Sequence, residues 1–214
     1  MIKIERLVFN PFQENTYVLY DESGECVIVD PGCSDKAEED ALDEFLISKS
    51  LKPVAQIFTH THIDHILGMS YVYKAYGLKP LMHRDALPFL ENAGQQAVMF
   101  GIEFTDGVKP DDFLEEGDEV KFGNSSLEVL HTPGHVNGHL SFVNREQKFA
   151  IVGDVLFRDS IGRTDLPSGD FDTLSHQIRS KIYTLGDEFA VYPGHGPDTT
   201  VRYEIINNPF VNGR

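Results

Sequence analysis

The feature that most constrains this chain is the segment 59–65, Thr-His-Thr-His-Ile-Asp-His, which follows directly after the apolar run 54–58. The apolar run predicts a buried strand. His60 and His62 are two residues apart, so an extended chain points both imidazoles to the same side. Asp64 and His65 stand where a helix could begin. Imidazole and carboxylate are the ligands that zinc-like cations prefer, so the segment predicts a metal site at the end of a strand.

Three further polar residues follow apolar runs in the same way, each beside a Gly or Pro that shapes a tight turn. They are His135, Asp154 and His195, which come after the apolar runs 127–130, 149–152 and 191–192. Taken alone, each of them is an ordinary loop residue. Because the same arrangement recurs at several strand exits, we expect these side chains to join the first segment in one ligand set assembled from separate loops.

The remaining pattern predicts an α/β fold in which strands and helices alternate. Strands are expected near 2–9, 15–21, 25–30, 54–59, 80–83, 119–123, 126–131, 139–144, 148–153 and 189–192. Helices are expected over 35–49, with Ser34 or Asp35 as the cap, and over 172–185, with Asp172 as the cap and Gly186 as the end. Weaker helical patterns cover 66–76, 85–99 and 199–207. With no repeat or low-complexity linker, residues 1–214 are expected to form a single domain.

Charge and composition indicate the class of partner. Lys and Arg number 18 against 34 Asp and Glu, which gives a formal net charge of −16. Such a surface repels phosphate backbones and anionic membranes, so we expect a small-molecule substrate and neither nucleic acid nor membrane as partner. The first residues lack a secretory pattern, and the two cysteines form no CxxC pair, so the cytoplasm is the expected compartment. The oligomeric state stays open.

The order of the candidate ligands resembles that of the metallo-β-lactamase-fold hydrolases. The pattern is His60-x-His62-x-Asp64-His65, followed by His135, Asp154 and His195. The flanking segments 29–32 (Val-Asp-Pro-Gly), 162–165 (Gly-Arg-Thr-Asp) and 193–197 (Pro-Gly-His-Gly-Pro) are most similar to the short, single-domain glyoxalase II-like branch, which resembles hydroxyacylglutathione hydrolases. The resemblance implies a four-layer αββα sandwich of the metallo-β-lactamase type. The sequence departs from the family's pattern at Val136, where relatives often carry Thr or Ser, and at Thr61, where many carry Gly.

The resemblance also implies two divalent metal ions, with zinc expected and iron or manganese as alternatives. His60, His62 and His135 would hold one ion, Asp64, His65 and His195 the other, and Asp154 would bridge them. The implied reaction is hydrolysis of a thioester of the hydroxyacylglutathione type by a metal-bound hydroxide, with Asp64 as both ligand and proton acceptor. Arg163 is a candidate contact for an anionic substrate group, and a structural ion pair is its alternative role. Asp30 and His139 are expected to support the ligands.

Three alternatives remain at this point. One is a single-iron persulfide dioxygenase on the same fold, using His60 or His135 with Asp154 as the iron ligands. A second is a hydrolase of a lactone or another small ester. The third is a metal-binding module without activity. The complete second set of Asp64, His65 and His195 favours an enzyme with two metals, and no serine nucleophile elbow or phosphate-binding loop competes with it.

Overall fold

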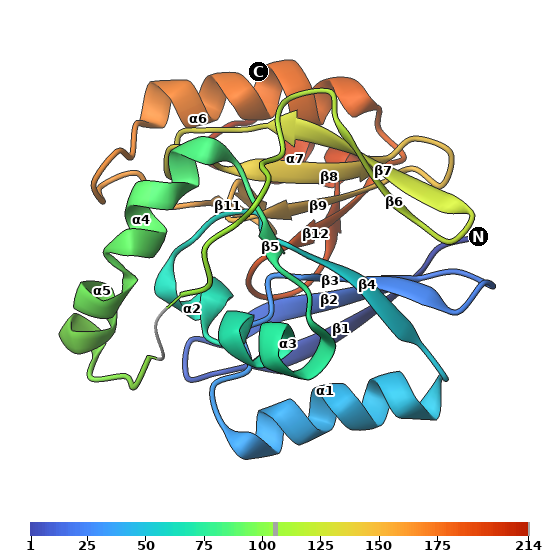
Figure 1. Ribbon diagram of the computed structural model, residues 1–214. Helices are drawn as coiled ribbons and strands as arrows, with labels where there is room; N and C mark the ends of the chain where they lie inside the picture. Colours follow the sequence, from blue (N-terminus) through green and yellow to red (C-terminus); the bar gives the residue numbers. More distant parts are fainter. Residues whose placement is uncertain (105–106, 214) are drawn as a thin grey trace. The chain divides into compact units, whose positions relative to one another are not determined.

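The computed structural model describes residues 1–104 and 107–213, which divide into two compact units (Figure 1). The first unit comprises Met1–Leu114 together with Lys121–Ser126. The second comprises Glu115–Val120 together with the chain from Leu127 onward. Helices and mixed sheets occur in both units, which confirms the α/β class. The single domain expected over 1–214 stays a prediction.

The first unit is built on a five-stranded sheet with the order β1-β2-β3-β4-β5. Its strands are β1 (Lys3–Phe9), β2 (Glu14–Tyr20), β3 (Glu25–Val29), β4 (Lys52–Ile57) and β5 (Pro80–Leu81). The first three strands pair antiparallel, whereas β3, β4 and β5 run parallel. The helices of this unit are α1 (Lys36–Ser48), α2 (Ile63–Ile66), α3 (Met69–Tyr76), α4 (Leu87–Glu91) and α5 (Ala93–Phe100), with a 3-10 turn at Arg84–Ala86.

Helix α1 covers one face of this sheet (Figure 1). Leu42 and Leu46, one helical turn apart, pack in the same apolar cluster as Val18 and Ile28 of the sheet and Val72 of α3. The helix begins at its predicted cap, because the Asp35 carboxylate accepts hydrogen bonds from the backbone N–H groups of positions 37 and 38. The burial of one helical stripe therefore fixes α1 on the sheet.

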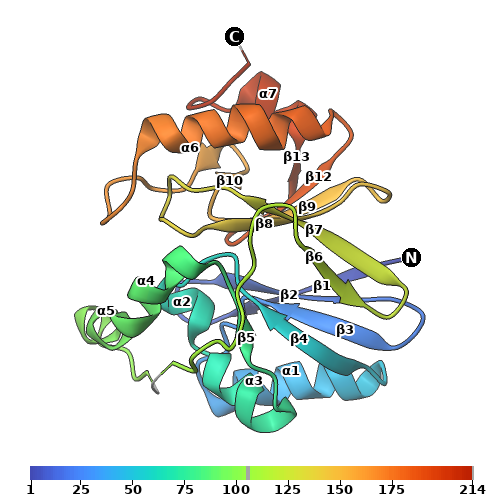
Figure 2. The ribbon, with the colours of Figure 1, turned by 45° about the horizontal axis from the view of Figure 1, so that its top comes forward.

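The second unit contains most of a six-stranded sheet with the order β13-β12-β9-β8-β7-β6. Its strands are β6 (Glu119–Phe122), β7 (Ser125–His131), β8 (Leu140–Asn144), β9 (Phe149–Gly153), β12 (Ala190–Pro193) and β13 (Thr199–Thr200). The short hairpin of β10 (Leu156–Phe157) and β11 (Ser160–Ile161) follows β9. Helices α6 (Phe171–Gln177) and α7 (Val201–Asn207) share an apolar cluster with strands β9 and β12 through Val152, Leu174, Val191 and Val201 (Figure 2).

The predicted helix 172–185 is wrong in its details. The cap is Asp170, whose carboxylate accepts a 2.7 Å hydrogen bond from the backbone N–H of Thr173, and Asp172 lies inside the first turn. Helix α6 ends at Gln177 and continues as a π-helical turn, Ile178–Ile182, and a 3-10 turn, Tyr183–Leu185. The predicted end at Gly186 is confirmed.

Two other helical predictions also divide into shorter pieces. The pattern over 66–76 covers the end of α2 and all of α3, and the one over 85–99 covers parts of the 3-10 turn, α4 and α5. Strands β10, β11 and β13 were not predicted, because two residues are too few to show an alternation. The longer strands agree with their predictions to within about two residues.

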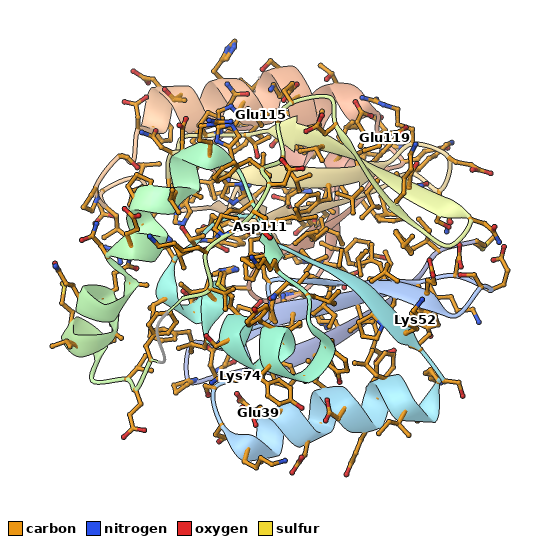
Figure 3. All side chains as sticks on the ribbon, in the orientation of Figure 1. Glu39, Lys52, Lys74, Asp111, Glu115 and Glu119 are labelled. Atoms are coloured by element: carbon orange, nitrogen blue, oxygen red, sulfur yellow. The ribbon has the colours of Figure 1, made fainter. Side chains whose placement is uncertain are left out.

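Several charged side chains lie on the outside of each unit. Lys52, Asp111, Glu115 and Glu119 are exposed (Figure 3). Lys52 pairs with Glu25 at 3.4 Å, which is a surface contact of small energetic weight. Within the described residues, none of the helices has the length and apolarity that a membrane span requires.

Candidate metal centre

The four candidate ligands of the first unit lie where strand β4 leads into helix α2. His60 is fully buried in the loop after β4, and His62, with extended backbone, is the residue before the first turn of α2. Asp64 and His65 lie within that turn. The prediction that a helix begins at these residues is confirmed, and the change from extended chain to helix gathers all four side chains.

The distances within two pairs of this first donor set, His60 with His62 and Asp64 with His65, fit pairs of ligands to a common cation. His60 Nε2 lies 3.1 Å from His62 Nδ1, and His65 Nε2 lies 3.7 Å from Asp64 Oδ2. The rings of His60 and His65 have centroids 4.1 Å apart. Two nitrogens bound to one tetrahedral zinc at ~2.0–2.1 Å would lie roughly 3.3–3.4 Å from each other. The donor atoms are thus spaced as metal ligands are, and they are of the types that zinc or iron accepts.

Asp30 supports this set from the end of β3, as predicted. Its Oδ2 lies 3.0 Å from His65 Nδ1, and its carboxylate accepts hydrogen bonds from the backbone N–H and the hydroxyl of Thr59. The Nδ1 nitrogen of His65 is therefore directed at Asp30, which leaves Nε2 facing Asp64. One ligand atom from each of Asp30, His60 and His65 lies within 4.8 Å of the others.

Glu14 is a second buried carboxyl beside His65, and the sequence pattern did not predict it. Its side chain is inaccessible to solvent, its Oε2 accepts a hydrogen bond from Thr16 Oγ1, and its Oε1 lies 4.0 Å from His65 Nδ1. Burial raises the pKa of Glu14 well above its ordinary value, while the neighbouring His65 opposes the rise. One glutamate in a strand carries no pattern that distinguishes it from a surface residue.

The second unit brings His135, Asp154 and His195 together. Asp154 Oδ2 lies 3.6 Å from His135 Nε2 and 3.7 Å from His195 Nε2. One carboxylate oxygen is therefore nearly equidistant from two imidazole nitrogens, at separations that fit ligands of a metal ion. These residues follow β7, β9 and β12, so their prediction as side chains at strand exits is confirmed.

Backbone contacts orient this second donor set. His135 Nδ1 donates a 2.7 Å hydrogen bond to the carbonyl oxygen of Arg163, so Nε2 carries the lone pair that faces Asp154. The N–H of Asp154 donates to His139 Nε2 at 3.1 Å, which gives His139 the supporting role predicted for it. A Cβ at Gly162 would lie 1.8 Å from the Asp154 carbonyl oxygen, so only glycine fits there.

The side chain of Arg163 forms an ion pair. Its Nε and one terminal nitrogen each lie 2.8 Å from an oxygen of Asp165. The hydrogen bond from Arg163 lowers the pKa of Asp165 to about 2. Both side chains are largely exposed, at 58% and 69%. The alternative role of Arg163 as a structural ion pair is thus present, and its contact with substrate stays a prediction.

Other titratable residues have structural roles. His83 Nδ1 accepts a hydrogen bond from the N–H of Asp85 and so caps the 3-10 turn. Cys26 and Cys33 lie in the apolar cluster beneath α1. Burial raises the pKa of Cys26 to about 12, which makes a thiolate ligand unfavourable there.

Known proteins are similar to this chain in sequence and in fold. The pattern of the Metallo-beta-lactamase superfamily matches residues 9–195. Hydroxyacylglutathione hydrolase GloC of Haemophilus influenzae is 35% identical over the full length of both chains. The crystal structure of the BLEG-1 B3 metallo-beta-lactamase is 35% identical, with a TM-score of 0.89 over 99% of each chain. A di-iron-bound form of TTHA1623 is 36% identical, with a TM-score of 0.86 over 96% of this chain and 99% of that one.

These matches agree with the resemblance first seen in the ligand order, and they confirm the metallo-β-lactamase fold. The histidine and aspartate clusters of the two units are suited to binding metal ions. The chain therefore belongs to the metallo-β-lactamase superfamily, as one of its metallo-hydrolases.

Proposed function

We propose that the two donor sets together bind two divalent metal ions and that the protein hydrolyses a small thioester. The observation that carries the proposal is the position of Asp154 Oδ2, 3.6 Å from His135 Nε2 and 3.7 Å from His195 Nε2, because a carboxylate there can offer an oxygen to each of two ions. In the proposed centre His60, His62 and His135 would hold one ion, Asp64, His65 and His195 would hold the other, and Asp154 would be a ligand common to both. Zinc is the expected metal, with iron or manganese as alternatives.

When bound, two such ions would supply hydroxide near neutral pH by lowering the pKa of water. The residues of the chain then have two different roles, proton transfer and the orientation of the histidine ligands. Asp64 would accept the proton as the thioester carbonyl is attacked, because its carboxylate lies 3.7 Å from His65 Nε2, at the candidate metal site. Asp30 and the carbonyl of Arg163 hold His65 and His135 in the tautomers that leave Nε2 available. The products are a carboxylic acid and a thiol.

The proposed substrate is a thioester of the hydroxyacylglutathione type. Its support is the full-length similarity to a protein named hydroxyacylglutathione hydrolase. The guanidinium of Arg163 is exposed and could exchange Asp165 for a carboxylate of the substrate. A cytoplasmic small-molecule enzyme folded as one domain fits the charge and composition.

The test is to purify the protein without added metal, count its zinc, iron and manganese by mass spectrometry, and assay S-lactoylglutathione with the same preparation. We expect about two divalent ions per chain and thioester hydrolysis that chelation abolishes. An S-lactoyl thioester of N-acetylcysteamine, which lacks the glutathione carboxylates, is the matched control substrate. One iron per chain with oxygen consumption on a persulfide would replace the proposal with a dioxygenase.

A further inference from the structure

The side-chain amide of Asn10 joins the metal-ligand helix α2 to the loop after β3. Its Nδ2 donates hydrogen bonds to the carbonyl oxygen of Asp64 at 2.9 Å and to that of Gly32 at 3.0 Å. Its Oδ1 accepts a 3.0 Å hydrogen bond from the N–H of Phe12. Both N–H donors of this amide are thus used within the first unit, and one of its partners is the backbone of a candidate metal ligand.

The backbone of Asn10 is itself fixed. It has a φ of +55°, a left-handed conformation that asparagine tolerates better than most residues, and it is only 8% exposed. Its N–H donates to Glu38 Oε1 at 2.6 Å, and its carbonyl accepts from the N–H of Gln13. The turn between β1 and β2 is therefore rigid, and the amide approaches Asp64 from a fixed base.

The packing around Gly32 leaves the Asp64 backbone little freedom. A Cβ at Gly32 would lie 2.0 Å from Glu14 Oε2, 2.8 Å from the Asp64 carbonyl oxygen and 2.9 Å from Asn10 Nδ2. Gly32, Glu14, Asp64 and Asn10 are thus in close contact, and the Asn10 amide donates to the carbonyl oxygens of both Gly32 and Asp64. Without it, both carbonyl groups would lose this hydrogen bond in a crowded, largely buried site.

We propose that Asn10 is a positioning residue for Asp64. Its amide holds the first turn of α2 so that the Asp64 carboxylate faces His65 Nε2, at the 3.7 Å separation that a common metal ion requires. The inference rests on the proposed function, because it takes Asp64 as a metal ligand. The effect of Asn10 on metal binding therefore requires the Asp64 carboxylate.

The test measures zinc dissociation constants by competition with a chromogenic chelator. Asn10→Gly removes the amide and accepts the positive φ. Asn208→Gly is the matched control, since Asn208 is also buried and its amide donates to the Ser160 carbonyl and to Glu204. We expect Asn10→Gly to raise the dissociation constant of one of the two zinc-binding steps about tenfold or more. Asn208→Gly should change neither dissociation constant beyond about twofold.

A double-mutant cycle separates positioning from general damage. In an Asp64→Asn background, Asn10→Gly is expected to have no further effect on zinc affinity. If Asn10→Gly does not fold, Asn10→Ser, whose hydroxyl can serve one of the two carbonyls, is expected to give a smaller loss of the same step. Unchanged affinity in the Asn10 variants, or a loss that persists without the Asp64 carboxylate, overturns the inference alone. A wild-type chain that binds no metal overturns the proposed function and this inference with it.

Discussion

The carbonyl oxygen of Arg163 accepts a 2.7 Å hydrogen bond from His135 Nδ1. The contact that orients this ligand thus comes from the backbone, whereas the guanidinium of the same residue pairs with Asp165. The two functions of one residue can therefore be separated by mutation.

Arg163→Met is expected to keep the full metal load, because it leaves the carbonyl in place. Because this ion pair is exposed, its loss should leave the free energy of unfolding nearly unchanged. If the guanidinium contacts substrate, KM for S-lactoylglutathione rises while kcat and the hydrolysis of the N-acetylcysteamine thioester stay the same. Asp165→Asn is the control for the ion pair alone. Metal analysis and steady-state kinetics check these outcomes, and a loss of metal would contradict them.

Gly162→Ala is expected to disrupt the second donor set. The new methyl group would lie 1.8 Å from the Asp154 carbonyl oxygen and 3.1 Å from His135 Nδ1, so one backbone segment must move. We expect a loss of about 1–3 kcal/mol in the free energy of unfolding, together with a reduced metal content. Urea unfolding and metal counting measure both. Gly94→Ala in α5 is the matched control, because its Cβ meets nothing within 4 Å and stability should stay the same or rise slightly.

Asp64→Asn is expected to lower kcat for thioester hydrolysis by roughly a hundredfold to ten-thousandfold, because an amide cannot accept a proton. It should also weaken the binding of one metal ion, since a neutral amide oxygen is a poorer ligand than a carboxylate oxygen. Asp111→Asn, which removes an exposed carboxylate that pairs with Lys79, is the control and should leave kcat unchanged. Full turnover with a full metal load in Asp64→Asn would remove this residue from the mechanism.

Asp21 makes stability depend on pH. Burial opposes its ionisation, but hydrogen bonds from Ser23, Ser125 and Asn124 outweigh burial and lower its pKa from 3.8 to about 2. A depressed pKa in the folded state stabilises the protein above the unfolded pKa, and this contribution is lost as the pH falls from about 4 through 2. We expect Asp21→Asn to cost about 1–2 kcal/mol at pH 7 and little near pH 2.

Urea unfolding of the metal-free protein at pH 7 and at pH 3 measures this difference without interference from metal release. The gap between wild type and Asp21→Asn should narrow at the lower pH. A gap that stays constant with pH would mean that Asp21 acts through packing rather than through its charge.

The candidate ligands could be recognised in the sequence because their pattern is local. His60, His62, Asp64 and His65 lie within six positions, and the other ligands follow apolar strands. The supporting contacts were not predictable in the same way. Asn10 reaches a carbonyl oxygen 54 positions along the chain, and Glu14 lies beside His65 only after the sheet has formed. No periodic pattern of residues in the sequence predicts either contact.

The long predicted helix over 172–185 shows a different limit. Its apolar stripe, Leu174, Ile178 and Ile182, is buried as expected. A spacing of four residues keeps side chains on one face in an α-helical and in a wider π-helical turn alike, so the stripe could not reveal where the π turn begins. The cap at Asp170 was missed because two aspartates compete for the role, and backbone geometry decides between them.

The two compact units exchange chain segments around residues 115–126, and this has a consequence for dissecting the protein. Lys121–Ser126 groups with the first unit through contacts such as those of Asp21 with Asn124 and Ser125, while the residues on both sides of it group with the second. No single cut in the polypeptide can release both units whole. A gene split at any one codon would leave at least one unit without part of its chain, so the two donor sets cannot both be obtained in complete units as separate halves.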